Sequence, residues 1–348
     1  MMHKSNREES YKLSPQLKFY DSMKASWKTY SMFGHFANIR SEYCNTDVDG
    51  LRFNSFKSNF KSIFDQNNSK NCAVITGNST AFGEGVSKDE KTMSNILSNK
   101  TDLFFYNLCG RGLNGFQEII YFIQNLNRLN NLKKIFVITS INDALLPEYE
   151  NIKNQQYSPI FGQNFFEKTM SSSLISWKFK VLKFFLNPFL KRNNWHQLNK
   201  LNWKKELFKK SIEYDQDMSP NDVIENTIRN NINIWNYLSK GMNLEIKIFL
   251  QPICLWSNKP LTTEEITIIN EEKKNLKIKK IFDIANQEKY KLVKKYFKNE
   301  CEKNEIYFED LNEIMNLENN KNLWLFNGNF HLSDLGTNIA TNQILKNY

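Results

Sequence analysis

From about residue 71 onward, short apolar runs alternate with amphipathic stretches. The apolar runs of strand length are 72–76, 102–108, 134–139, 245–250 and 305–308. Their β-branched and aromatic content predicts buried strands, and the stretch 116–129 has the pattern of an amphipathic helix. Strands separated by single helices indicate a parallel sheet with both faces covered. We therefore predict an α/β fold, a three-layer α/β/α sandwich around a central, mostly parallel five-stranded sheet.

Polar residues predict where three of the helices begin. Ser87–Glu90 has the spacing of a capping box, in which the glutamate returns to the serine amide. Thr262–Glu265 predicts the start of a long charged helix that reaches about Asn299. Ser333–Asp334 predicts the start of the final helix.

Two parts of the chain depart from this alternation. Residues 1–70 are rich in aromatic side chains but weakly periodic, which predicts an N-terminal extension packed on a main domain of 71–348. Within the extension, Arg52 follows a predicted turn, and its expected role is structural, with a place near the site as the alternative. Residues 150–240 contain helical tracts without a clear strand, which predicts a helical insertion.

Composition places this chain of 348 residues in the globular class, with 40% hydrophobic and 24% charged residues. The net charge is +10, but ten Lys and Arg against one Glu between residues 171 and 210 account for nearly all of it. Because a nucleic-acid protein carries its basic residues over a whole binding surface, this confinement argues against one.

The basic, aromatic stretch 177–210 allows three interpretations. It could be a core-facing stripe with a solvated Lys face, an interfacial helix on an anionic membrane, or a lid that shapes the site. We favour a helical insertion that covers the site, with peripheral membrane contact as a hypothesis.

The scattered cysteines and the lack of a long apolar run predict a cytoplasmic protein. An alternative within this prediction is a cytoplasmic protein that contacts the inner face of a membrane. The five cysteines form no CxxC pair, so they are expected to be free thiols and not a zinc site or disulfides. The first ten residues lack the apolar region of a signal peptide, and no run of about 18 apolar residues occurs. The sequence predicts no cofactor and no metal.

Candidate chemistry lies at the ends of the predicted strands. Gly77–Gly85 follows the first strand with a glycine-rich turn that presents the hydroxyl of Ser79, a candidate nucleophile. Gly110–Gly112 and Ser140–Asp143 end the next two strands, and His331 precedes the last helix. Because functional groups collect at the carboxyl ends of parallel strands, these segments are expected to meet.

In these residues the chain resembles the SGNH (GDSL-type) hydrolase family. Gly77–Gly85 matches its GDSxxxGxG block with Asn in place of Asp, and Asn107–Gly112 resembles its second block. Ser140–Asp143 resembles the GxND block with Ser for Gly, and His331–Gly336 resembles the block that carries the catalytic histidine. The blocks occur in the family's order, and the fold that the resemblance implies is flavodoxin-like.

The resemblance implies acyl transfer through a serine ester. Ser79 would be the nucleophile and His331 the general base and then acid, while the Ser79 amide, the Gly112 amide and the Asn142 side chain would form the oxyanion hole. The family usually has Asp three residues before the histidine, where this chain has Gly328. The side chain of either flanking asparagine could orient the ring instead: Asn327 or Asn329.

The function implied is a serine esterase that hydrolyses a small acyl ester, with O-acetyl groups of a glycan as the narrower expectation. One alternative is an O-acyltransferase that uses the same pair with a sugar as acceptor. Another is a catalytically silent binding protein that has the fold but lacks the triad Asp. A phosphate-binding loop is disfavoured because no Gly-Lys-Ser/Thr follows Gly85.

Overall fold

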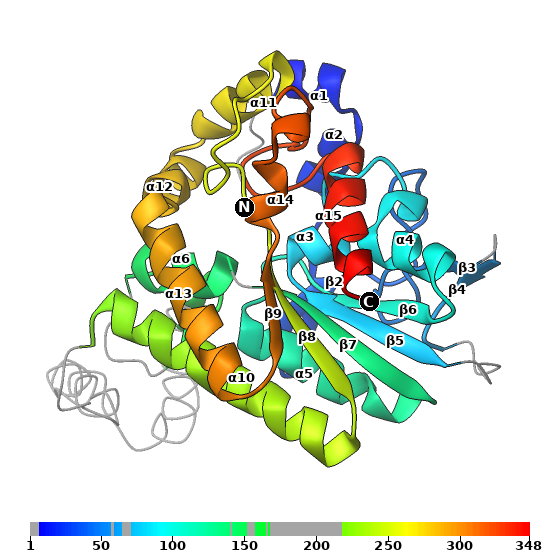
Figure 1. Ribbon diagram of the computed structural model, residues 1–348. Helices are drawn as coiled ribbons and strands as arrows, with labels where there is room; N and C mark the ends of the chain where they lie inside the picture. Colours follow the sequence, from blue (N-terminus) through cyan, green and yellow to red (C-terminus); the bar gives the residue numbers. More distant parts are fainter. Residues whose placement is uncertain are drawn as a thin grey trace, which may run out of the picture.

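The central sheet has five strands in the computed structural model of the chain (Figure 1). The structure describes residues 7–348 except 57–58, 65–70, 140, 152–156, 165 and 168–217. The strands are β5 (Cys72–Gly77), β6 (Phe104–Cys109), β7 (Leu132–Thr139), β8 (Glu245–Leu250) and β9 (Tyr307–Asp310). All four pairings between neighbouring strands are parallel, which confirms the predicted sheet.

The strand order is β6-β5-β7-β8-β9. The chain therefore goes from β5 to one edge of the sheet and then returns to the other side of β5. This is the flavodoxin-like order, in which ligand sites form at the carboxyl ends of the strands where the order reverses. The residues that follow β5 lie at that point.

Helices connect the strands and cover both faces of the sheet (Figure 1). They are α3 (Ser79–Phe82), α4 (Met93–Lys100), α5 (Gly115–Asn125), α6 (Ile141–Tyr149), α10 (Pro220–Met242), α11 (Thr263–Lys273), α12 (Leu276–Ile284), α13 (Gln287–Lys303), α14 (Asn312–Met315) and α15 (Asp334–Lys346). Among the described residues, short 3-10 turns accompany them at Asp89–Lys91, Leu126–Arg128 and Glu318–Asn320.

The three layers follow from the alternation of side chains along the central strand. Val74 of β5 lies in a buried cluster with Phe122 of α5 and Phe297 of α13. The next residue, Ile75, lies in a second buried cluster, which includes Leu97 of α4. Because successive strand residues point to opposite faces, the two clusters are the two sides of the sandwich.

The predicted capping box at Ser87–Glu90 is wrong. Thr92 is the N-cap of α4, and its hydroxyl accepts a hydrogen bond from the Asn95 amide at 3.3 Å. The Ser87 hydroxyl donates instead to the Asp334 carboxylate at 2.5 Å, so Ser87 anchors the start of α15. A local pattern was overridden by a partner 247 positions away.

The helix start predicted at Thr262 is confirmed, and a capping box with Glu265 forms there, but the single long helix predicted from there to about Asn299 is wrong. The segment contains α11, α12 and α13, and an asparagine stands at each of the two breaks. The side chains of Asn275 and Asn286 each accept a hydrogen bond from an amide in the first turn of the next helix. Such Asn caps favour a new helix start over continuation. The last helix begins where predicted, with Ser333 as its N-cap.

The N-terminal extension contains α1 (Glu8–Leu13), α2 (Gln16–Ser22), β1 (Ala25–Lys28), β2 (Met32–His35), β3 (Asn54–Phe56) and β4 (Asn59–Lys61). Strands β1 and β2 form an antiparallel hairpin. Gln117 of α5 donates to the Ser31 carbonyl at the hairpin turn, at 2.6 Å. On α1, the Ser10 amide and hydroxyl both donate to Glu271 of α11, at 2.7 and 2.6 Å. The extension is thus bonded to helices on both sides of the sheet.

Most of the predicted insertion at 150–240, including the basic stretch 177–210, lies outside the described residues. Its final part is helix α10, which begins with a capping box between Ser219 and Asp222. Within the described residues, no helix combines the length and apolar character needed to cross a bilayer. All five cysteines are free and buried.

Candidate active site

Ser79 is the first residue of α3, immediately after β5. Asn78 caps this helix, with its side-chain oxygen accepting from the Thr80 amide at 3.1 Å. The Asn78 amide group donates to the side-chain oxygen of Gln251 at the end of β8. A carboxylate could not make this second bond, which explains why Asn fits where the family has Asp. At Gly77 a Cβ atom would lie 2.2 Å from the Ile138 carbonyl oxygen, so the tight exit from the strand requires glycine.

His331 lies opposite Ser79. Its Nε2 atom is 3.0 Å from the Ser79 hydroxyl oxygen, within the reach of a general base. The Thr80 hydroxyl donates to the Phe330 carbonyl at 2.8 Å, which ties the two loops together beside this contact. The His331 carbonyl accepts from the Asn327 amide at 2.9 Å, and the helix that Ser333 caps follows directly. The backbone that carries the imidazole is therefore fixed on both sides.

Burial lowers the pKa of His331 below 6.5. The Glu84 carboxylate opposes this effect and the Arg111 guanidinium adds to it. The side chain is 19% exposed. A neutral imidazole at pH 7, with Nε2 within hydrogen-bond distance of the Ser79 hydroxyl, can accept the serine proton.

The three strand-end loops that the sequence singled out meet at this place. The Gly110 amide donates to the Gly77 carbonyl at 3.0 Å, which joins the loops after β6 and β5. The Asn142 side chain donates to the Leu113 carbonyl at 2.6 Å, which joins the loop after β7 to them. The expectation that the segments meet at the carboxyl edge of the sheet is thus met by the structure.

The predicted oxyanion donors are partly exposed on these loops. Within the described part of the chain, neither the Ser79 nor the Gly112 amide donates a hydrogen bond to another residue. Gly112 has φ +73°, a left-handed conformation that glycine adopts readily. Asn142 uses one of its two N–H groups on the Leu113 carbonyl, which leaves the other for a ligand.

The asparagines expected to orient His331 have other partners. The Asn327 side chain donates to the Gly85 carbonyl at 2.8 Å and accepts from the Ser14 hydroxyl at 3.0 Å. The Asn329 side-chain oxygen accepts from the Leu255 amide at 3.1 Å. Among the described residues, neither side chain bonds to the His331 ring. We therefore correct the expected orienting role: these asparagines shape the loop.

Position 328 cannot hold the family's aspartate in this loop. Gly328 has φ +127°, and a Cβ atom there would lie 2.3 Å from a carboxylate oxygen of Glu272. Glu272 itself accepts from the Asn329 amide at 2.9 Å and pairs with Arg7 of the extension at 3.2 Å. The space that an aspartate would need is filled by another carboxylate.

An ion pair that was not predicted from the sequence lies beside the catalytic candidates. Glu84, in the loop after Ser79, accepts from Arg111 through both carboxylate oxygens, at 2.6 and 2.7 Å. Burial alone would raise the pKa of Glu84, but Arg111 and then His331 lower it to about 2. One Glu84 oxygen lies 3.6 Å from His331 Nε2. The sequence shows the opposite charges of Glu84 and Arg111 in the first and second blocks, but their spacing does not indicate that the two side chains meet.

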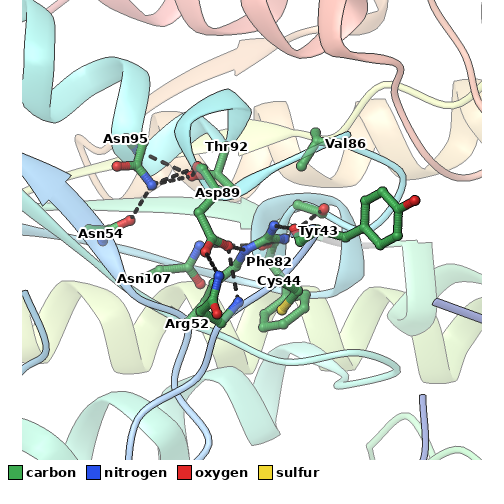
Figure 2. A network of polar contacts seen from close by, with 12 residues as sticks. Tyr43, Cys44, Arg52, Asn54, Phe82, Val86, Asp89, Thr92, Asn95 and Asn107 are labelled. Atoms are coloured by element: carbon green, nitrogen blue, oxygen red, sulfur yellow. Dashed lines mark hydrogen bonds and ion pairs between the residues drawn. The ribbon is translucent and has the colours of Figure 1, made fainter. Parts of the chain in front are cut away.

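Arg52 of the extension contacts the end of α3, the short helix that begins at Ser79 (Figure 2). Its guanidinium donates to the carbonyls of Phe82 and Gly83, at 3.1 and 2.9 Å, where α3 ends. It also pairs with Asp89 at 2.7 Å and donates to the Tyr43 carbonyl at 2.6 Å, with its side chain fully buried. Arg52 thus combines the two roles considered for it, since it is structural and lies next to the nucleophile loop.

Within the described residues, no group of three or more His, Cys, Asp or Glu side chains could hold a metal ion. The described residues place at the site a serine hydroxyl, an imidazole, the Asn142 side chain, backbone amides and the Glu84–Arg111 ion pair.

Comparisons with known proteins gave distant structural similarity only. No family model matches the chain, and no curated protein matches it significantly. An extracellular lipase from Streptomyces rimosus is 10% identical with a TM-score of 0.42, and the alignment covers 80% of this chain and 99% of the lipase. A phospholipase A1 from Streptomyces albidoflavus is 9% identical with a TM-score of 0.42 and the same coverages. An acetyl xylan esterase is 10% identical with a TM-score of 0.37, over 79% of this chain and 98% of the esterase.

Proposed function

We propose that the protein is a serine esterase that hydrolyses a small acyl ester through a Ser79–His331 dyad. The observation that carries this proposal is the 3.0 Å contact between the Ser79 hydroxyl and His331 Nε2 at the switch point of the sheet. Two backbone amides and one side-chain amide on the adjoining loops complete the set of groups that acyl transfer needs.

In the first half of the reaction, the Ser79 O–H bond breaks and its proton moves to His331 Nε2. The serine oxygen bonds to the ester carbonyl carbon, and the displaced electron pair moves to the carbonyl oxygen, which faces the amides of Ser79 and Gly112 and the side chain of Asn142. The tetrahedral centre then expels the alcohol, which takes the proton from Nε2. Water repeats the sequence on the acyl-serine and releases the acid.

For the acyl part, we propose a short group such as acetyl. The Phe33 ring of the β1–β2 hairpin comes within 3.4 Å of the position that a Cβ atom would occupy at Gly112. Bulk is therefore already present beside a proposed oxyanion donor. An O-acetylated glycan is the narrower proposal for the alcohol part, and it derives from the family resemblance alone.

The test is hydrolysis of p-nitrophenyl esters of increasing chain length, from acetate to octanoate. We expect turnover of the acetate by the wild type and a loss of about 10²-fold or more in kcat for His331→Ala, the usual weight of a general base. Ser79→Ala should abolish labelling by a fluorophosphonate. Ser22→Ala is the matched control, because that exposed hydroxyl donates only to the Phe19 carbonyl.

Three outcomes would change the conclusion. Wild-type turnover and fluorophosphonate labelling no greater than those of Ser79→Ala would refute the enzyme and favour a silent binding protein. Transfer of acetyl to a sugar in preference to water would indicate an acyltransferase. Unchanged chain-length preference in Phe33→Ala would remove the acyl-pocket role of that ring.

A further inference from the structure

The carboxylate nearest to the proposed base comes from the nucleophile loop itself. Glu84 follows Gly83, the left-handed residue with φ +91° that ends α3. This turn directs the Glu84 side chain back toward the site, where one oxygen lies 3.6 Å from His331 Nε2. The carboxylate is 10% exposed, so solvent screens this contact less than it would a surface pair.

Arg111 fixes that carboxylate in place. Its guanidinium binds both Glu84 oxygens, and another of its nitrogens donates to the Met23 carbonyl at 3.1 Å. The Arg111 backbone amide donates to Nε2 of the buried His35 at 3.3 Å. A bidentate Arg–carboxylate pair with these additional anchors has a defined geometry and not a range of rotamers.

We infer that Glu84 is the carboxylate partner of His331, held by Arg111, and that it takes over the charge-stabilising part of the role of the aspartate absent at Gly328. The inference rests in part on the proposed function. Glu84 faces Nε2, the nitrogen that receives the serine proton, and not Nδ1. It therefore stabilises the imidazolium charge when the proton arrives, and it does not take over the part of the aspartate's role that orients the ring through Nδ1.

The charges around His331 make the role of Glu84 separable from that of its partner. Glu84 favours the protonated ring, and Arg111 disfavours it. From the extension, Arg7 also disfavours it, while Asp21 favours it. Arg7 and Asp21 are paired with each other at 3.2 Å, so their opposite effects are expected to offset one another in variants of Glu84 and Arg111.

The experiment is the titration of His331 by NMR of the histidine ring carbons in the full chain, which has four histidines. The signal is assigned by its loss in His331→Gln. In Glu84→Gln the pKa of His331 should fall, because Arg111 then acts without its counter-charge. In Arg111→Gln it should rise, because Glu84 then acts alone. Glu302→Gln is the control, since it removes a carboxylate from an exposed ion pair on α13.

Shifts of opposite sign are the result that supports the inference, because a merely structural pair would not produce them. Shifts of the same sign, or no shift in either variant, would overturn it. If Glu84→Gln does not fold, the neutral pair Glu84→Gln/Arg111→Gln replaces it, and its His331 pKa should lie below that of Arg111→Gln alone. A pKa equal to that of Arg111→Gln would overturn the inference.

Activity provides the second readout. Glu84→Gln removes a contact to a charged group, and this is expected to lower kcat/KM by about 10- to 100-fold. Glu84→Asp should recover part of that loss. A Glu84→Gln variant with wild-type kcat/KM would also overturn the inference. Because the NMR titration needs no turnover, it can succeed or fail whether or not the protein hydrolyses esters. The failure of this inference is thus distinguishable from the failure of the proposed function.

Discussion

Replacing Arg52 with methionine should destabilise the protein severely and loosen the nucleophile loop. Methionine keeps much of the apolar stem but removes the guanidinium, which binds Asp89 and three backbone carbonyls. Each carbonyl retains a second, longer bond; the Phe82 carbonyl, for example, still accepts from the Asn107 amide at 3.4 Å. Most of the lost stability is therefore expected to come from the Asp89 carboxylate, which is 2% exposed and would be left buried without its counter-charge.

Removing one partner of a buried ion pair typically costs about 3–5 kcal/mol, against a total stability of about 5–15 kcal/mol. Asp89 keeps the Asn45 side-chain amide at 2.8 Å, which places the expected cost of Arg52→Met toward the lower end, near 3 kcal/mol. The measurement is urea unfolding followed by tryptophan fluorescence. The two proteins should have the same slope of unfolding free energy against urea concentration, so that the shift of the midpoint reports the change in stability. The double variant Arg52→Met/Asp89→Asn should recover part of the loss, because no charge is then left buried.

Two results would refute this reasoning. A loss below about 1 kcal/mol for Arg52→Met would mean that the pair is screened as surface pairs are. A double variant less stable than Arg52→Met would mean that the carbonyl bonds, and not the unpaired charge, set the cost. Lys298→Met is the control, because its ion pair with Glu302 is exposed on both sides and should be worth less than about 1 kcal/mol.

Three further predictions concern the site and its surroundings. The kcat/KM for an acetyl ester should rise with pH to a plateau with a midpoint below 6.5, because burial lowers the pKa of His331; a midpoint above 7 would contradict this. Gly328→Asp should not create a triad, because its side chain would collide with Glu272, and it should cost about 1–3 kcal/mol in urea unfolding without raising kcat/KM; a gain in kcat/KM would count against the loop geometry. Burial raises the pKa of Asp143 from 3.8 to about 7. Between these two pH values the native state keeps a proton on Asp143 that the unfolded state has lost, so the free energy of unfolding falls as the pH rises from one value to the other. Asp143→Asn should therefore gain stability relative to wild type between pH 5 and pH 8, whereas a constant difference in unfolding free energy would refute the shift.

The sheet could be predicted because its strands are mostly apolar runs bounded by turn residues. In β5 and β6 every residue is buried, and Asn107 is the one amide side chain within these two runs. The meeting of the Ser79, Gly112 and Asn142 loops also follows from the sequence, because parallel strands bring their carboxyl ends to one edge.

The errors have physical causes that local patterns do not contain. Ser87 satisfies the spacing of a capping box, yet Asp334 binds it from the far end of the chain. Glu84 and Arg111 are 27 positions apart, and nothing in the spacing of the two blocks indicates that their side chains meet. The helix after Thr262 breaks at asparagines whose polar caps outweigh an otherwise continuous helical composition.

The contacts of the extension also have a consequence for the order of events during synthesis. Ser10 binds Glu271, 261 positions later, and Ser14 binds Asn327, 313 positions later. At about 5–20 residues per second, the ribosome takes about 15–60 s to add the intervening residues. During that time α1 has none of these partners, and the loop that carries His331 does not yet exist. We therefore expect α1 to dock at about the same time as the loop that carries His331 forms, and both to be late events of folding.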